Sequence, residues 1–229
     1  MSAQRYRRGP GKRAPRDRVF ILTEGTATEV EYYEGVCRRL GLPKELIVVK
    51  KARNTQAKGI VDELVEEKRS NNKLANRGRD TRIDQWWAVV DTECRPEELA
   101  PAIQKAKDNG VFIAISDPSF EYWLRLHFGY TTSQYGSVGK LIKDLRQADR
   151  LPGYDEHNKH PDMEVLYPLL PEAMKNARQV RENHTKLGNG QPRTDCDLLV
   201  DVLATQVKQE RVPFKRKPFD QSKLSMNLL

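Results

Sequence analysis

Short apolar runs alternate with longer amphipathic segments through the first half of the chain. The apolar runs lack polar alternation, which is typical of parallel strands covered on both faces, and they lie at residues 19–22, 46–49, 86–90 and 111–115. Segments with apolar residues at helical spacing separate them, at residues 26–40, 55–74 and 96–109. This alternation predicts an α/β fold, in which a mostly parallel sheet with right-handed crossovers is flanked by helices.

The second half of the chain differs, because helical patterns follow one another without strands. We expect helices at residues 119–129, 137–148, 166–185 and 195–209. Residues 71–84 are predicted to form a polar, Arg-rich loop. The chain therefore divides into a basic flexible N-terminal arm (1–17), an α/β core (18–132), a helical extension (133–207) and a basic C-terminal tail (208–229).

Two of the predicted strands are followed directly by acidic residues. Glu24 comes after the first strand, and Asp91 and Glu93 come after the strand at 86–90. Open α/β sheets bind ligands at the carboxyl ends of their strands, so we expect these side chains to converge. Carboxylates about 4 Å apart repel by roughly 4 kcal/mol per pair at an effective dielectric near 20. Such a cluster favours proton uptake or a divalent cation, for which Mg²⁺ is the first candidate.

Two overlapping helix-capping signals follow the first strand, Thr26 with Glu29 and Thr28 with Glu31. They predict a helix N-terminus immediately after the acidic turn. A strand, an acidic turn that contains glycine and a capped helix can present a carboxylate and backbone N–H groups to one anion. Phosphate chemistry fits that arrangement.

Three motifs in this chain resemble the RloB family. They are Ile-Leu-Thr-Glu-Gly at 21–25 with Thr28-Glu29 and Tyr32-Tyr33, Val-Val-Asp-Thr-Glu at 89–93, and Ala-Ile-Ser-Asp-Pro-Ser-Phe-Glu-Tyr-Trp-Leu-Arg-Leu-His-Phe at 114–128. The resemblance extends over about residues 18–204, and the last motif is its most specific part. It implies a Toprim-like (Rossmann-like) core, related to that of topoisomerases, primases and OLD-type nucleases, and a setting beside restriction and phage-defence genes.

The resemblance also implies roles for the strand-end acids. Glu24 matches the first-strand glutamate of the Toprim pattern, a metal-associated or acid/base position, and Asp91 with Glu93 matches its Asp-x-Asp metal motif. Glutamate at 93 adds a methylene, which would shift the position or the choice of the metal, Mg²⁺ or Mn²⁺. Asp117 stands where the pattern has asparagine, and residues 191–194 resemble the later Asn-Pro-Ser-Thr motif only loosely.

Several of these candidates also have a purely structural interpretation. Glu93 is either a metal ligand or the start of the acidic loop that continues through residues 97–98. Glu121 is either an accessory metal ligand or half of an ion pair with an arginine. His127 is either a ligand or a hydrogen-bonded core histidine. Asp117 is a further accessory candidate.

The net charge of +8 is concentrated at the two ends of the chain. Residues 1–18 contain seven basic and one acidic residue, and residues 208–229 contain six and two, so the middle of the chain is slightly acidic. Segments of this composition are expected to stay mobile when alone, and they either bind nucleic-acid phosphates or aid solubility. The N-terminal candidates for nucleic-acid binding are Arg5, Arg7, Arg8, Lys12 and Arg13.

These patterns favour a Mg²⁺- or Mn²⁺-dependent nuclease that acts on DNA or RNA, including tRNA, in phage defence and abortive infection. The RloB resemblance implies an ABC/AAA-type ATPase partner encoded nearby. The chain itself contains no Gly-rich Walker loop, so any ATP dependence would come from that partner. The alternative is a non-catalytic nucleic-acid-binding or regulatory subunit of such an ATPase. No apolar run approaches the roughly 20 residues of a membrane span and no signal-type segment is present, so we expect a cytoplasmic protein without a membrane partner.

Overall fold

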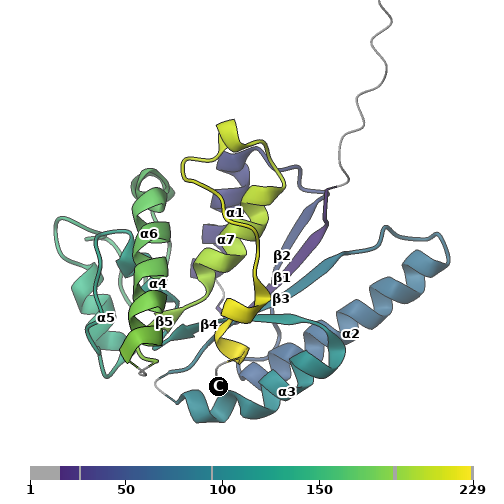
Figure 1. The fold of residues 1–229 in the computed structure, drawn as a ribbon, viewed down its shortest axis with the longest axis horizontal. Coiled ribbons are helices and arrows are strands. Elements are labelled where there is room, and N and C mark those ends of the chain that lie inside the picture. The colour runs from purple at the N-terminus through teal and green to yellow at the C-terminus, as the bar shows by residue number, and fades with distance from the viewer. Residues whose placement is uncertain (1–15, 26, 94, 188–189, 228–229) are drawn as a thin grey trace, which may run out of the picture.

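The computed structural model describes residues 16–25, 27–93, 95–187 and 190–227. A five-stranded sheet of order β2-β1-β3-β4-β5 forms its centre (Figure 1). The strands are β1 (Val19–Thr23), β2 (Ile47–Lys51), β3 (Gln85–Asp91), β4 (Phe112–Asp117) and β5 (Arg193–Thr194). The first four are parallel and β5 is antiparallel to β4. The predicted α/β class and its four parallel strands are therefore confirmed.

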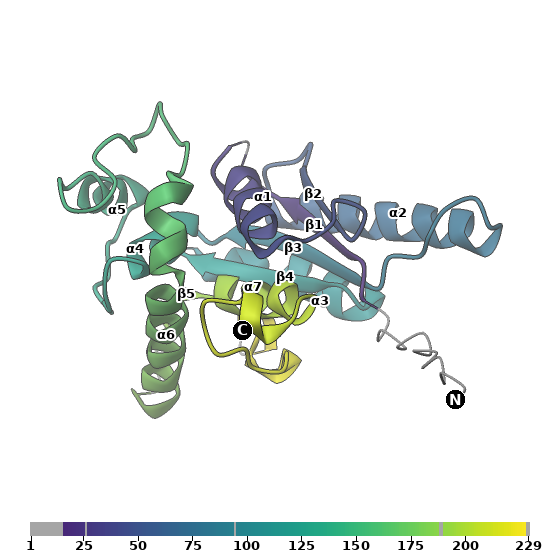
Figure 2. The ribbon, with the colours of Figure 1, turned by 90° about the horizontal axis from the view of Figure 1, so that it is seen from above.

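Helices cover both faces of the sheet and one of its edges. They are α1 (Thr28–Leu40), α2 (Ala57–Asn76), α3 (Ala100–Asn109), α4 (Phe120–Leu126), α5 (Val138–Leu145), α6 (Met163–Leu187) and α7 (Cys196–Thr205), with 3₁₀ turns at Pro96–Leu99, Gln209–Arg211, Gln221–Lys223 and Ser225–Asn227. Helices α1 and α7 lie on one side of the sheet, α2 and α3 lie on the other, and α4–α6 lie beside the β5 edge (Figures 1 and 2). Across the described ranges, no helix has both the length and the apolar character needed to cross a membrane.

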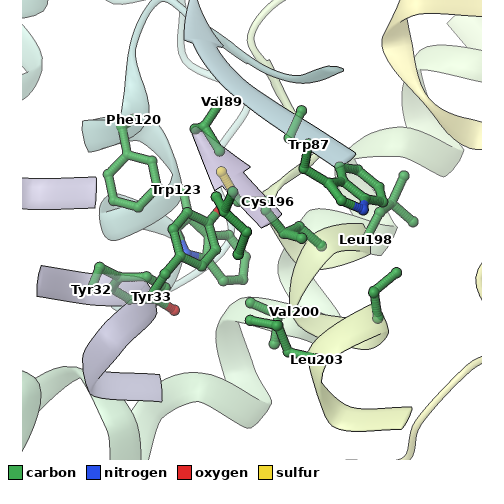
Figure 3. Packing of buried hydrophobic residues seen from close by; sticks show 14 of the residues in the cluster. Tyr32, Tyr33, Trp87, Val89, Phe120, Trp123, Cys196, Leu198, Val200 and Leu203 are labelled. Carbon is green, nitrogen blue, oxygen red and sulfur yellow. The ribbon is translucent and has the colours of Figure 1, made fainter. Parts of the chain in front are cut away.

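The core joins the sheet to the helical layer through large aromatic side chains. All five residues of β1 are buried, as expected for a strand covered on both faces. Tyr32 of α1 makes edge contacts with Phe120 and Trp123 of α4, with ring centroids 5.5 and 6.2 Å apart (Figure 3). Full burial of such a side chain contributes about 1.5–3 kcal/mol. This packing fixes α1 and α4, whose N-terminal ends both face the carboxyl ends of the strands.

The predicted capping box of Thr28 with Glu31 is not formed. The helix begins at Thr28, with Ala27 in the N-cap position and no side-chain cap. The Thr28 hydroxyl instead donates to the Lys159 carbonyl oxygen at 2.7 Å. Glu29 Oε1 accepts the Gly25 N–H at 3.2 Å, one turn outside the helix. Contacts with distant segments outweigh the local pattern, and Thr26 lies outside the described residues.

The predicted loop at 71–84 is partly wrong, because α2 continues to Asn76. No glycine or proline interrupts the helical pattern between Gly59 and Gly78. The two-residue strand β5 was not predicted, since so short a strand leaves no periodicity in the sequence. The other helices match the prediction except for shifts at their ends.

The C-terminal tail is packed onto the fold, so the expectation that it stays mobile is wrong for its described residues. Leu224 is fully buried, and the Phe219 ring lies 5.2 Å from the Trp87 ring. The Ser225 N–H donates to both carboxylate oxygens of Asp195. A few apolar residues among the basic ones are enough to bind this segment to the core. The N-terminal candidates, Arg5 to Arg13, lie outside the described residues.

Candidate active site

A pocket of about 190 Å³ lies at the carboxyl ends of β1 and β3. Five carboxylates and one lysine are among its lining side chains, which are Glu24, Glu29, Asp91, Glu93, Glu121 and Lys159. The structure thus brings the three predicted strand-end acids to one pocket. It adds Glu29 and Lys159, which the sequence analysis did not identify as site residues, and the accessory candidate Glu121.

Glu24 and Asp91 link the ends of the two strands directly. Glu24 Oε2 accepts the Asp91 N–H at 3.2 Å, while Asp91 Oδ1 is buried without a hydrogen-bond partner. Burial raises the pKa of Glu24 to about 7. Burial also raises the pKa of Asp91 well above its usual range, and the carboxylates of Glu29, Glu121 and Glu24 raise it further. Near neutral pH the pocket must therefore either hold protons or bind a cation.

Gly25 allows Glu29 to reach into this site. A Cβ atom at position 25 would lie 1.9 Å from Glu29 Oε2, so no residue with a side chain fits without displacing that carboxylate. The Glu29 side chain is buried, and burial is the main reason that its pKa is raised. The Glu-Gly pair therefore positions two acids, one from the end of β1 and one from the first turn of α1.

Glu121 accepts hydrogen bonds from two hydroxyls and forms an ion pair with a lysine. Its Oε2 accepts the Ser119 hydroxyl at 2.5 Å, and its Oε1 accepts the Tyr154 hydroxyl at 2.9 Å. Lys159 Nζ lies 3.6 Å from the same Oε1. The predicted arginine partner is thus replaced by a lysine. Lys159 reaches the site because the Thr28 hydroxyl binds its carbonyl oxygen, a contact across 131 residues that no local pattern signals.

Glu93 lies at the rim of the pocket. Its backbone has φ 48°, the left-handed region that is uncommon for residues other than glycine. The side chain is 59% exposed, and its Oε2 lies 2.9 Å from Arg95 Nη2. An exposed ion pair of this kind is weak. Glu93 is therefore the least buried of the acids in the pocket, and it already has a cationic neighbour.

Two accessory candidates lie outside the pocket lining. The buried His127 ring contacts the Tyr32 hydroxyl at 3.1 Å through Nε2 and the Trp123 carbonyl oxygen at 3.1 Å through Nδ1. Burial lowers the His127 pKa to about 4, so this core histidine is neutral and matches the structural alternative. Asp117, at the end of β4, accepts the Thr92 hydroxyl, and burial raises its pKa.

The donor set of the pocket fits a hard divalent cation. Carboxylate oxygens are the ligands that Mg²⁺ and Mn²⁺ prefer, and the unpaired Asp91 Oδ1 leaves one such oxygen buried and unsatisfied. Nowhere in the described ranges, however, are three or more His, Cys, Asp or Glu side chains already arranged around a common point as metal ligands. The carboxylate oxygens and the negative charge of the pocket therefore suit a cation, although the side chains are not already arranged around one point.

A family model for RloB-like proteins matches residues 19–203. The chain belongs to the RloB-like family. This match spans the whole sheet and every residue that lines the acidic pocket. It confirms the resemblance that the three motifs carry. Comparisons with curated proteins and with solved structures gave no match.

Proposed function

We propose that this RloB-like protein is a metal-dependent nuclease that hydrolyses phosphodiester bonds of DNA or RNA, tRNA included, in phage defence. The observation that carries the proposal is the group of carboxylates in one pocket, with Asp91 Oδ1 buried among them and unpaired. Asp91 and Glu29 would hold Mg²⁺ or Mn²⁺, and Glu24 would act beside them as general acid or base. Bound there, the cation would neutralise charge on the phosphate and lower the pKa of a bound water.

The side chains of the pocket supply the remaining chemistry. A pKa of about 7 allows Glu24 to take a proton from the attacking water, or to return one to the leaving oxygen, near neutral pH. Lys159 provides a positive charge where a phosphate would enter. The Ser119 and Tyr154 hydroxyls fix Glu121, which in turn keeps the Lys159 ammonium at the pocket.

A cleavage assay tests the proposal. The purified protein is incubated with DNA and with total RNA, with and without the ATPase encoded nearby, in Mg²⁺, Mn²⁺ or EDTA. Asp91→Asn keeps the size of the side chain but removes a charge that the ion needs, so cleavage should fall by orders of magnitude. The melting temperature should hold or rise, because carboxylate repulsion is relieved.

The matched control for this variant is Asp108→Asn, an exposed position on α3. It removes the same charge from a different surface and should leave cleavage unchanged. Metal-dependent cleavage that survives Asp91→Asn at the wild-type rate would reject this pocket as the active site, and no cleavage by the wild type, with or without the ATPase, would reject the nuclease proposal.

One observation favours a second candidate, a non-catalytic regulatory subunit of the ATPase. Glu93 occupies the second acid of the metal motif, yet its carboxylate is exposed and pairs with Arg95. A regulator would bind nucleic acid or the ATPase without cleaving any substrate, alone or with its partner. Phage-defence assays separate the two candidates, because Asp91→Asn would abolish defence by a nuclease and spare defence by a regulator.

A further inference from the structure

Helix α2 extends well beyond the core that it covers. Its buried apolar residues, Ile60, Val61, Leu64 and Val65, all belong to its first half. In the second half only Asn71 is buried. A helix of 20 residues is about 30 Å long, so its last turns carry the chain away from the sheet, as both views show (Figures 1 and 2).

The projecting end of α2 and the segment that returns to β3 are strongly basic. Residues 68–82, which we name the basic hairpin, contain six basic residues and one acidic residue. Lys68 and Arg69 bind Asn109 and anchor the hairpin to α3. Its remaining four basic side chains are exposed and have no ion pair or side-chain hydrogen bond to any described residue; they are Lys73, Arg77, Arg79 and Arg82.

This pattern differs from an ordinary solvated surface. Elsewhere on α2, Lys58 pairs with Asp62 at 2.6 Å, and Lys105 of α3 lies 3.3 Å from the same carboxylate. The only acid of the basic hairpin, Asp80, accepts Asn71 Nδ2 at 2.9 Å and lies 4.0 Å from Arg18 Nη1, so it pairs with none of these four cations. The hairpin therefore presents its positive charge outward without local compensation.

The basic hairpin has a defined shape. Asn71 donates to Asp80 and to the Thr81 carbonyl oxygen, and its own Oδ1 accepts the Ile83 N–H at 3.0 Å. Arg18, just before β1, donates to the same Thr81 carbonyl oxygen at 2.5 Å. Residues 1–15, which contain five more basic residues, therefore join the described chain close to the base of the hairpin.

The basic hairpin and the acidic pocket lie at opposite ends of α2. Ala57, the first residue of α2, lines a pocket together with Glu24 and Asp91, whereas the hairpin leads into the amino end of β3. A phosphate group meets repulsion at the carboxylates, so affinity for a nucleic acid has to come from another surface. The hairpin offers such a surface, because Lys73 on α2 and the three arginines beyond its end are exposed cations.

We propose that the basic hairpin binds the phosphate backbone of a nucleic acid at a distance from the acidic pocket. The link between the hairpin and the acidic pocket rests on the proposed nuclease function. A nucleic acid that reaches both must extend about 30 Å, which corresponds to about nine nucleotide steps at 3.4 Å each. The substrate is then a duplex or folded nucleic acid of at least this length, because shorter fragments cannot contact the hairpin and the pocket together.

Binding is tested with Arg77→Gln/Arg79→Gln/Arg82→Gln, compared with Lys143→Gln/Arg146→Gln/Lys175→Gln. The control removes the same charge from exposed positions on α5, directly after α5 and on α6, at the other end of the molecule (Figure 1). All proteins also carry Asp91→Asn and are kept in EDTA, so that no cleavage occurs. Duplex DNA and duplex RNA of about 30 base pairs are titrated at several salt concentrations.

The hairpin variant should bind at least tenfold more weakly at low salt. The slope of log K against log salt should decrease by about 2–3, since each lost phosphate contact contributes about 0.9. The control should bind like the parent, and melting temperatures should match, because the substituted side chains are exposed. A loss with only one of the two duplexes identifies the sugar that is preferred. Unchanged affinity and slope on both duplexes would overturn the proposal.

Cleavage by proteins with the intact pocket separates the two proposals. If the pocket cleaves, the hairpin variant should show a higher KM and an unchanged kcat on long duplexes, with no change on duplexes shorter than about nine base pairs. If no protein cleaves but the hairpin variant still loses affinity, the nuclease proposal fails and the hairpin proposal stands.

Discussion

The metal-free protein should lose stability as the pH rises from 5 to 8, because the acidic pocket is more stable when it is protonated. The pKa of Glu24 is raised from 4.5 to about 7 in the folded protein. Because the pKa is higher in the folded than in the unfolded protein, Glu24 contributes its full stabilisation at pH values below the unfolded pKa. This contribution is lost as the pH rises through about 4.5 to 7. Burial moves the pKa of Asp91 and Glu29 in the same direction.

The size of the effect follows from the Glu24 pKa. A change from 4.5 to about 7 corresponds to about 3 kcal/mol, and solvent screening at this partly exposed carboxyl reduces it to about 1–2 kcal/mol. For a chain of this length, 1 kcal/mol changes the melting temperature by about 2–4 °C. Glu24→Gln, which cannot ionise, should therefore reduce the loss in melting temperature between pH 5 and pH 8 by about 2–8 °C.

Thermal unfolding of the wild type, Glu24→Gln and Glu66→Gln at pH 5 and pH 8 in EDTA measures this effect. Glu66 is exposed on α2 and serves as the matched control. Other buried acids titrate in the same range, such as Asp195 with a pKa raised to about 6, but they contribute equally to all three proteins. Mg²⁺ or Mn²⁺ should restore wild-type stability at pH 8 and have little effect at pH 5. An identical pH dependence for the wild type and Glu24→Gln would refute the reasoning.

Four further predictions concern other parts of the chain. Gly25→Ala should reduce cleavage at least tenfold without unfolding the protein, because a Cβ would displace the facing carboxylate; activity and circular dichroism check both effects. Glu93→Gln should change cleavage by less than tenfold in the same assay, since its side chain is exposed and paired with an arginine. Deletion of residues 1–17 should weaken nucleic-acid binding and flatten its salt dependence, with little change in melting temperature. Leu224→Ala should destabilise the protein by about 2–4 kcal/mol in urea unfolding, because Leu224 is fully buried.

The sheet and the first acids of the site could be predicted because their signals are local. An apolar run followed by a carboxylate marks the carboxyl end of a covered strand, which applies to Glu24 and Asp91 alike. The sheet order then brings β1 and β3 together, so the two residues become neighbours. For these two residues, a pattern of six or seven sequence positions is enough to predict that they lie at the end of a covered strand.

The rest of the pocket depends on contacts between distant segments. Lys159 reaches it through a hydrogen bond to Thr28, and Tyr154 joins it by donating to Glu121. Glu29 carried a local signal, the capping box, which pointed to a different role. Its actual role depends on the absence of a side chain at Gly25, and only the three-dimensional arrangement shows how closely the two approach.

The distribution of charge predicts an order of events for the proposed reaction. Without a cation, the carboxylates of the pocket that are ionised repel a phosphate, so substrate held by the basic hairpin would stay outside the pocket. A divalent cation reverses the sign of the local field and draws the phosphate inward. The apparent KM for nucleic acid should therefore decrease as Mg²⁺ or Mn²⁺ increases, whereas affinity measured at the hairpin alone should not. Because Lys159 is the one cation among the side chains that line the described pocket, Lys159→Gln should make the KM depend more steeply on metal concentration.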